Sequence, residues 1–291
     1  MRALAVMRAG MEAGGGNDLA VVHFSGHGAM VDRKLYLLPD EVDARDDAGI
    51  KASALSADDL KGELLELARH GHFVLGVCRT KPEELVDPPR FPQSDYIAWK
   101  SLDLSDAPAV VKFASSLEST AIRVLILCAV DYGASGRRPA AATSAQEWQQ
   151  VIATNCIGHC LLVSSLLPKL VANSLGVIVN ISSDVALLPA AGRAAYAASK
   201  AGLHAMLRAV AAEHSAEDLR VYQLIPTFQL VTSGIRGRRP IGFDFSSYGE
   251  PALLAKVVRQ LVAPSGTSPA PGSYLVRRDG TLSPSPENTH I

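Results

Sequence analysis

Three polar side chains have types and a spacing that could move a proton to or from a carbonyl group: Ser183, Tyr196 and Lys200. The apolar segment Gly176–Ile181 predicts a buried parallel strand, and Ser183 follows its carboxyl end, where α/β sheets bind ligands. Tyr196 stands thirteen residues after Ser183 and Lys200 four residues later on a predicted helix, so the two share one helix face. An ammonium beside a phenol favours the phenolate, so we expect Tyr196 to have a pKa below about 10. Tyr196 is therefore predicted to exchange the proton, and Ser183 to hold a substrate carbonyl.

Short apolar segments alternate with helical patterns along the chain. This order predicts an α/β fold with a doubly wound, mostly parallel, Rossmann-like sheet of about seven strands. The expected strands are Leu19–Phe24, Phe73–Cys78, Tyr96–Lys100, Ile122–Cys128, Gly176–Ile181, Leu219–Ile225 and Ser273–Val276. The expected helices are Ala57–His70, Ala107–Ser116, Ser144–Ala172, Ala194–His214 and Glu250–Val262.

Two motifs around the candidate residues resemble a known family. The sequence Ile178-Val179-Asn180-Ile181-Ser182-Ser183, followed by Tyr196-Ala197-Ala198-Ser199-Lys200, is similar to the signature of short-chain dehydrogenases/reductases at that family's own spacing. Asn155, on the preceding long helix, matches the fourth member of the family's catalytic tetrad. The resemblance implies hydride exchange between a nicotinamide and a carbonyl or alcohol substrate, with Tyr196 handling the proton. It also implies that Asn155 holds a water linking Lys200 to the proton relay.

The resemblance extends upstream to about residue 62 and implies a dinucleotide site. Arg79 ends the predicted strand where NAD enzymes of this kind carry an acidic residue, and with Lys81 it could meet a 2′-phosphate. NADP(H) is therefore the expected cofactor. Asp103 and Leu104 match the position that contacts adenine. The expected cofactor-binding residues are Arg79, Asp103, Leu104, Ala129, Tyr196, Lys200, Gly26 and Gly28.

Three motifs of the dinucleotide half depart from the family pattern. The glycine-rich phosphate loop, Thr-Gly-x-x-x-Gly-x-Gly, is absent. The family's Asn-Asn-Ala-Gly stands here as Leu127-Cys128-Ala129-Val130, and its Pro-Gly as Pro226-Thr227. Each change would place a side chain in the groove that holds the dinucleotide. A catalytically silent fusion or binding module with the same fold is therefore the alternative function.

The N-terminal segment resembles a different family. Residues 17–60, around Ser25-Gly26-His27-Gly28, are similar to the histidine strand of caspase-like peptidases. That resemblance implies His27 as catalytic histidine and Cys78, 51 residues later at a strand end, as nucleophile of a cysteine peptidase. The segment could also replace the missing first Rossmann unit, with Ser25–Gly28 at the phosphate-loop position. We therefore divide the chain into residues 1–61, a caspase-like segment that supplies the first strand, and residues 62–291, the short-chain dehydrogenase/reductase domain.

Composition limits the partners and the location. The chain has 291 residues, 48% of them hydrophobic and 20% charged, with a formal net charge of −1, which gives no electrostatic reason to expect nucleic acid or an anionic membrane. The four cysteines show no disulfide spacing, so we expect a reducing, cytoplasmic location. No metal site is expected, because Cys156, His159 and Cys160 share a helix without further ligands. The expected partners are a small carbonyl or alcohol substrate and, by resemblance, further copies of the chain that pack through Ser144–Ala172 and Ala194–His214.

Overall fold

A computed structural model describes residues 19–23, 27–31, 34–38, 55–56, 73–79, 97–117, 122–133, 137–172, 176–231, 239–249, 251–262 and 268–290. The helix expected over Ala57–His70 lies outside these residues, as do Ser25 and Gly26 of the expected phosphate-loop position.

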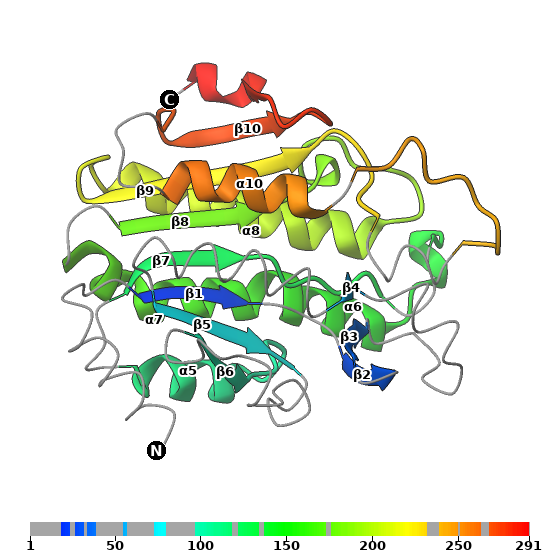
Figure 1. Cartoon of the computed structure of the whole chain (residues 1–291), viewed down its shortest axis with the longest axis horizontal. Helices are drawn as coiled ribbons and strands as arrows, with labels where there is room; N and C mark the ends of the chain where they lie inside the picture. The colour runs from blue at the N-terminus through cyan, green and yellow to red at the C-terminus, as the bar shows by residue number, and fades with distance from the viewer. Residues whose placement is uncertain are drawn as a thin grey trace.

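The part of the chain that the structure describes forms a main sheet of eight strands. Figure 1 shows how its labelled strands lie relative to one another. Their spatial order is β11 (Leu282–Pro284), β10 (Gly272–Val276), β9 (Leu219–Pro226), β8 (Gly176–Ile181), β7 (Ile122–Leu127), β1 (Leu19–His23), β5 (Phe73–Cys78) and β6 (Ile97–Ser101). All neighbours pair in parallel except β10 and β11. The strand beyond the expected seven is β11, which returns antiparallel along the edge of β10.

The order of the strands reverses beside β1. Leu19 of β1 is in register with Phe73 of β5 on one side and with Ile122 of β7 on the other. The chain therefore winds outward through β5 and β6 in one direction and through β7, β8, β9 and β10 in the other. Such a switch point opens a crevice at the carboxyl ends of the strands, which is where doubly wound sheets bind ligands.

A second, antiparallel sheet follows β1 in the chain. It consists of β2 (His27–Val31), β3 (Lys34–Leu38) and β4 (Leu55–Ser56). His27 begins β2, and Gly28 is paired there with Leu37 of β3.

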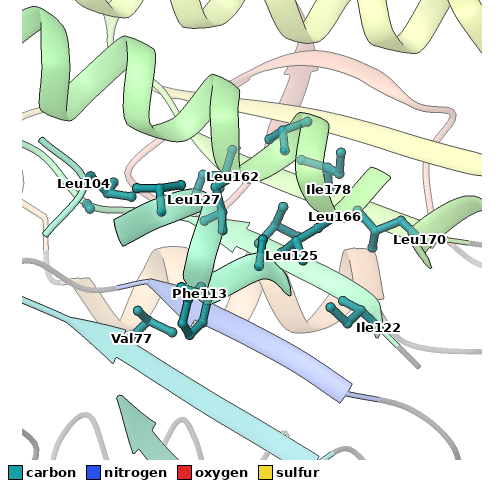
Figure 2. Close-up of a cluster of buried hydrophobic side chains, with 14 of the residues drawn as sticks. Val77, Leu104, Phe113, Ile122, Leu125, Leu127, Leu162, Leu166, Leu170 and Ile178 are labelled. Atoms are coloured by element: carbon teal, nitrogen blue, oxygen red, sulfur yellow. The ribbon is translucent and has the colours of Figure 1, made fainter. Parts of the chain in front are cut away.

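Helices cover both faces of the main sheet, because its strands alternate apolar side chains between two cores. On one face, Leu125 and Leu127 pack with α5 (Ala107–Ser115), α7 (His159–Ala172) and α8 (Ala194–Glu213), as Figure 2 shows in part. On the other face, Val124 and Ile126 pack under α10 (Pro251–Val262). Fully burying one such side chain contributes about 1.5–3 kcal/mol, so the two cores fix where each helix lies.

The helix before β8 is long and continuous. It runs through α6 (Ala145–Ile152), the π-helix η4 (Ala153–Gly158) and α7, and by length and hydropathy alone it could span a membrane. Its residues Leu162, Leu166 and Leu170 are fully buried in the sheet-facing core. This packing is that of a core helix.

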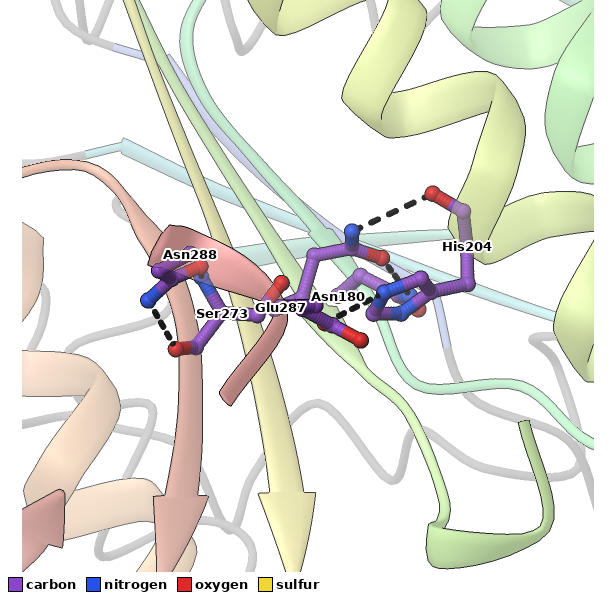
Figure 3. A network of polar contacts seen from close by, with 6 residues as sticks. Asn180, His204, Ser273, Glu287 and Asn288 are labelled. Carbon is purple, nitrogen blue, oxygen red and sulfur yellow. Dashed lines mark hydrogen bonds and ion pairs between the residues drawn. The ribbon is translucent and has the colours of Figure 1, made fainter. Parts of the chain in front are cut away.

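A buried polar network fastens α8 to the sheet and to the C-terminal segment (Figure 3). The Asn180 amide on β8 donates to Gln223 on β9 at 3.2 Å, and the Gln223 amide donates to the carbonyl of His204 on α8 at 3.2 Å. The imidazole Nε2 of His204 lies 2.7 Å from the carboxylate of Glu287 in the short helix η6 (Pro286–His290). Asn288 adds two bonds to the backbone of β10, at 3.1 and 2.7 Å. These contacts fix the position of α8 relative to β8 and β9.

Candidate active site

A cleft lies at the carboxyl ends of β8 and β9, where the sequence places its candidate residues. Ser183 follows β8 and caps the short helix η5 (Asp184–Ala186), while Tyr196 lies in the first turn of α8. Gly192 precedes α8 with φ of 78°, a left-handed conformation that favours glycine and lets the chain turn into the helix. The cleft is lined by Tyr132, Ser182, Ser183, Asp184, Arg193, Tyr196, Pro226, Phe228, Gln229 and Leu230.

The Tyr196 phenol is buried beside Ser183. The side chain is 7% exposed, its hydroxyl hydrogen-bonds the Ser183 side chain, and its ring lies 5.0 Å from the ring of Tyr132. Burial raises the pKa of Tyr196 well above 10, Tyr132 and Asp184 raise it further, and Ser183 and Arg193 lower it. The prediction that the pKa of Tyr196 lies below about 10 is wrong, because burial outweighs the groups that lower it. Tyr196 is therefore a neutral phenol at neutral pH, which is the form that donates a proton.

Lys200 is buried under the cleft and faces the end of β8. Its side chain is 3% exposed, and its ammonium donates to the carbonyl of Ile181 at 3.2 Å. Burial lowers the pKa of Lys200 to about 8, against an opposing effect of the Cys128 thiol. Since an ammonium has three donors and this contact uses one, Lys200 retains donors for a ligand.

Asn155 lies in the π-helix, which is a local widening often found at functional sites. Its amide oxygen accepts from the backbone amide of Asp131 at 2.6 Å, and its nitrogen donates to the Asp131 carbonyl at 2.6 Å and to the Ser199 hydroxyl at 3.1 Å. The side chain is fully buried. Asn155 therefore clamps the loop after β7 to α8, between Tyr196 and Lys200. The sequence did not reveal Asp131 or Ser199 as members of the site.

The candidate cofactor residues lie at the carboxyl ends of β5, β6 and β7. The carbonyl of Arg79, just after β5, accepts from Ser101 at 2.8 Å. The Asp103 carboxylate accepts from the amide and hydroxyl of Ser105 at 2.8 and 2.7 Å, which shapes the turn before α5. Leu104 is 2% exposed and belongs to the core, and Ala129 is 1% exposed.

The close approach of η4 to this turn explains a glycine. A Cβ added at Gly158 would lie 2.1 Å from the carbonyl oxygen of Leu104, so only glycine fits there. The π-helix that carries Asn155 therefore packs directly on the turn that carries Asp103 and Leu104.

At two positions that depart from the family pattern, the side chain contacts neighbouring residues of the protein. Val130 packs against the cluster that contains Val151 and Tyr196. The hydroxyl and the amide of Thr227 both donate to the Val276 carbonyl on β10, at 3.1 and 3.0 Å. Contacts within the protein therefore hold both side chains.

The remaining candidates are His27, Gly28 and Cys78. Cys78 ends β5 and His27 begins β2, and the side chains of both lie outside the described part of the structure. Gly28 lies within β2. Among the described residues, no group of three or more His, Cys, Asp and Glu side chains could hold a metal ion.

Curated relatives are similar to parts of this chain. A 3-oxoacyl-[acyl-carrier-protein] reductase of Chlamydia pneumoniae is 38% identical over 85 residues, which cover 29% of this chain and 34% of that protein. The inactive 2-(S)-hydroxypropyl-CoM dehydrogenase 2 of Xanthobacter autotrophicus is 29% identical over 160 residues, or 55% of this chain and 68% of that protein. The chain thus matches about a third of the length of the first of these relatives.

A solved structure has the same fold. A metagenomic short-chain oxidoreductase in complex with NADP superposes with a TM-score of 0.59 at 26% identity, over 74% of this chain and 90% of that one. Residues 65–237 match the family described as short chain dehydrogenase, a range that contains Asn155, Ser183, Tyr196 and Lys200. Since this range is more than half of the 291 residues, the chain belongs to the short-chain dehydrogenase family.

Proposed function

We propose that the protein is an NADP(H)-dependent oxidoreductase that exchanges a hydride with a carbonyl or alcohol substrate. The observation that carries the proposal is the neutral Tyr196 phenol, hydrogen-bonded to Ser183 in the wall of a cleft. When bound, the dinucleotide supplies or accepts the hydride. Tyr196 gives its phenolic proton to the substrate oxygen during reduction and recovers it during oxidation, while the Ser183 hydroxyl turns from Asp184 and donates to the same oxygen.

The buried Lys200 supports this proton transfer. As an ammonium at neutral pH, it stabilises the negative charge that forms on Tyr196 when the proton leaves. Because its bond to Ile181 uses one of three donors, it could also donate to the ribose hydroxyls of the dinucleotide. Asn155 positions this part of the site through the loop after β7 and through Ser199.

The cofactor preference is proposed to be NADP(H). Arg79, at the carboxyl end of β5, would meet the 2′-phosphate, and the turn at Asp103 and Leu104 would hold the adenine. The proposal is supported by the similar solved structure, which is a complex with NADP.

Binding and turnover test the proposal separately. Calorimetric titration of the full chain with NADPH is expected to give saturable binding, weaker with NADH. Tyr196→Phe should retain this binding and lose turnover of carbonyl substrates. Absence of dinucleotide binding at millimolar NADPH would overturn the proposal.

A catalytically silent binding module is the second candidate. It is supported by the similarity to a relative that is named inactive and by the absence of the glycine-rich loop from the sequence. It predicts a folded protein in which Tyr196→Phe changes nothing measurable. Any turnover that depends on Tyr196 would exclude it.

The cysteine-peptidase hypothesis for His27 and Cys78 stays a prediction from the sequence. It requires hydrolysis of a fluorogenic peptide that Cys78→Ala abolishes. We also propose a cytoplasmic homo-oligomer that packs through α6, η4, α7 and α8, where Ile157 of η4 exposes 48% of its surface. Light scattering with and without Ile157→Glu tests this assembly.

A further inference from the structure

We infer that the cleft selects substrates in which a carboxylate stands next to the reacting carbonyl or alcohol, and that Arg193 binds this carboxylate. The inference rests on the proposed oxidoreductase function and names its substrate class: oxo acids with an apolar body and the corresponding hydroxy acids.

The first observation is the position of Arg193. It precedes α8 as its N-terminal cap, three residues before Tyr196, and it lines the cleft with Tyr196 and Ser183. Its charge is close enough to act on the Tyr196 phenol. One small molecule could therefore place its carbonyl oxygen at Tyr196 and its carboxylate at Arg193.

The second observation is that Arg193 is half-buried and that its side chain makes no hydrogen bond or ion pair with any residue the structure describes. By contrast, Arg138 in the adjoining loop pairs with Glu147 at 3.7 Å. A guanidinium has five donors and its partial burial removes water from some of them. An anionic group of the substrate would supply the missing acceptor, and a carboxylate matches the fork of a guanidinium with two parallel bonds.

The neighbouring Asp184 carries the opposite charge, but the protein already uses it. Its carboxylate accepts from the Ser183 hydroxyl and from the Val185 amide, each at 2.9 Å, and the residue is exposed. Water and these donors screen its charge. The pair of charges orients an anionic substrate, with its carboxylate toward Arg193 and away from Asp184.

The rest of the cleft wall indicates what else the substrate carries. Tyr132, Phe228 and Leu230 present apolar surface, which suits an aryl or branched aliphatic body. Ser182 also lines the cleft, and its buried hydroxyl has no hydrogen-bond partner in the described structure. A second oxygen of the substrate would satisfy it.

The kinetic test uses a matched acid and ester. With NADPH, we expect reduction of benzoylformate by the wild-type protein. Arg193→Gln should lower kcat/KM for benzoylformate about 10- to 100-fold, the range for a hydrogen bond to a charged group, and change kcat/KM for methyl benzoylformate less than about threefold. Arg193→Lys should recover part of the loss because it keeps the charge. Arg277→Gln, an exposed arginine in the turn between β10 and β11, is the control for the charge change and should have no effect.

The binding test needs no turnover and separates the two proposals. Calorimetry should show that phenylacetate binds the wild type at least about tenfold more tightly than it binds Arg193→Gln, while phenylacetamide binds both equally. If no carbonyl is reduced but phenylacetate binding depends on Arg193, the anion site stands and the oxidoreductase proposal falls. If carbonyls are reduced but Arg193→Gln affects acid and ester equally, or neither, the inference about Arg193 is overturned. Melting curves of each variant show whether it is folded.

Discussion

The catalytic half of the site and the dinucleotide half differ in how they keep the family pattern. In the catalytic half, Asn155, Ser183, Tyr196 and Lys200 have the residue types and the spacing of the family. In the dinucleotide half, Val130 and Thr227 stand where the family has glycine. Both halves nevertheless lie on one sheet with the strand order of a doubly wound fold.

The difference reflects what each half must supply. Proton transfer needs particular functional groups at fixed distances, and in this chain the phenol of Tyr196 and the ammonium of Lys200 are the candidates. A dinucleotide groove needs mainly space and backbone donors, which other residues can leave free if their side chains turn elsewhere. Val130 packs against the cluster that contains Val151 and Tyr196, and Thr227 bonds to Val276, so in both cases the side chain has a partner in the protein. Proton-transfer chemistry thus constrains the residue types of the catalytic half, whereas the space that the cofactor needs constrains the dinucleotide half.

The largest expected effect is the loss of the phenol. Tyr196→Phe should lower kcat by about 10³-fold, within the range for removal of a general acid, and leave the NADPH dissociation constant within about threefold. Stopped-flow or steady-state oxidation of NADPH measures the first quantity and calorimetry the second. Retained turnover would show that Tyr196 is not the proton donor. Proton transfer would then no longer explain why the catalytic half keeps the family's residue types.

The next effect is that of the Lys200 charge. Lys200→Met should lower kcat by about 100-fold. In the wild type, activity should decline as pH rises past about 8, the pKa to which burial lowers this ammonium, because the neutral amine no longer stabilises the tyrosinate. NMR of the 13C-methylated lysine should show the same titration midpoint. A midpoint near 10.5 would show that Lys200 is not desolvated.

The same shift has a consequence for stability. A pKa of about 8 in the folded state lies below the usual 10.5, so between these pH values the unfolded chain holds more protons on this group. The free energy of unfolding of the wild type should therefore rise, relative to Lys200→Met, as pH increases from about 8 toward 10.5, and this gain is lost as pH falls through 8. Urea unfolding at several pH values measures it.

An intermediate effect is expected for the Asn155 clamp. Asn155→Ala leaves the amide and carbonyl of Asp131 without partners, which should cost about 2–3 kcal/mol of unfolding free energy and also lower kcat. Asn288→Ala is the matched control, because Asn288 makes the same two-bond clamp on the backbone of Ser273, and neither residue lines the cleft. It should cost similar stability and leave kcat unchanged. If both variants lower kcat equally, Asn155 has no special position in the catalytic half.

The smallest effect is expected in the dinucleotide half. Val130→Gly and Thr227→Gly restore the family's glycines, yet each should change the NADPH dissociation constant by less than about threefold, because neither side chain is proposed to occupy the groove. Val130→Gly should also destabilise the fold by about 1–3 kcal/mol, since it removes a side chain packed against the cluster that contains Val151. A gain of tenfold or more in NADPH affinity would show that these side chains do obstruct the cofactor.

Local pattern was sufficient to predict most elements. The predicted strands at Phe73–Cys78 and Gly176–Ile181 have the predicted bounds, and the helix predicted over Ala194–His214 ends one residue earlier, at Glu213. These elements are set by apolar periodicity along the chain, which the sequence displays directly. The spacing of Ser183, Tyr196 and Lys200 likewise indicated one site, because a strand end and a helix face fix the relative positions of nearby residues.

Tertiary structure decided the properties that depend on residues distant in sequence. Asn155 meets Asp131 and Ser199, which lie 24 and 44 positions away, and no local period relates them. The pKa of Tyr196 rises because the fold buries the phenol near Tyr132 and Asp184, and the opposing effects of Ser183 and Arg193 do not outweigh this burial. The sequence by itself therefore determined which groups are available for chemistry, and the packing of the chain determined their protonation, their partners and the place of Arg193 in the cleft.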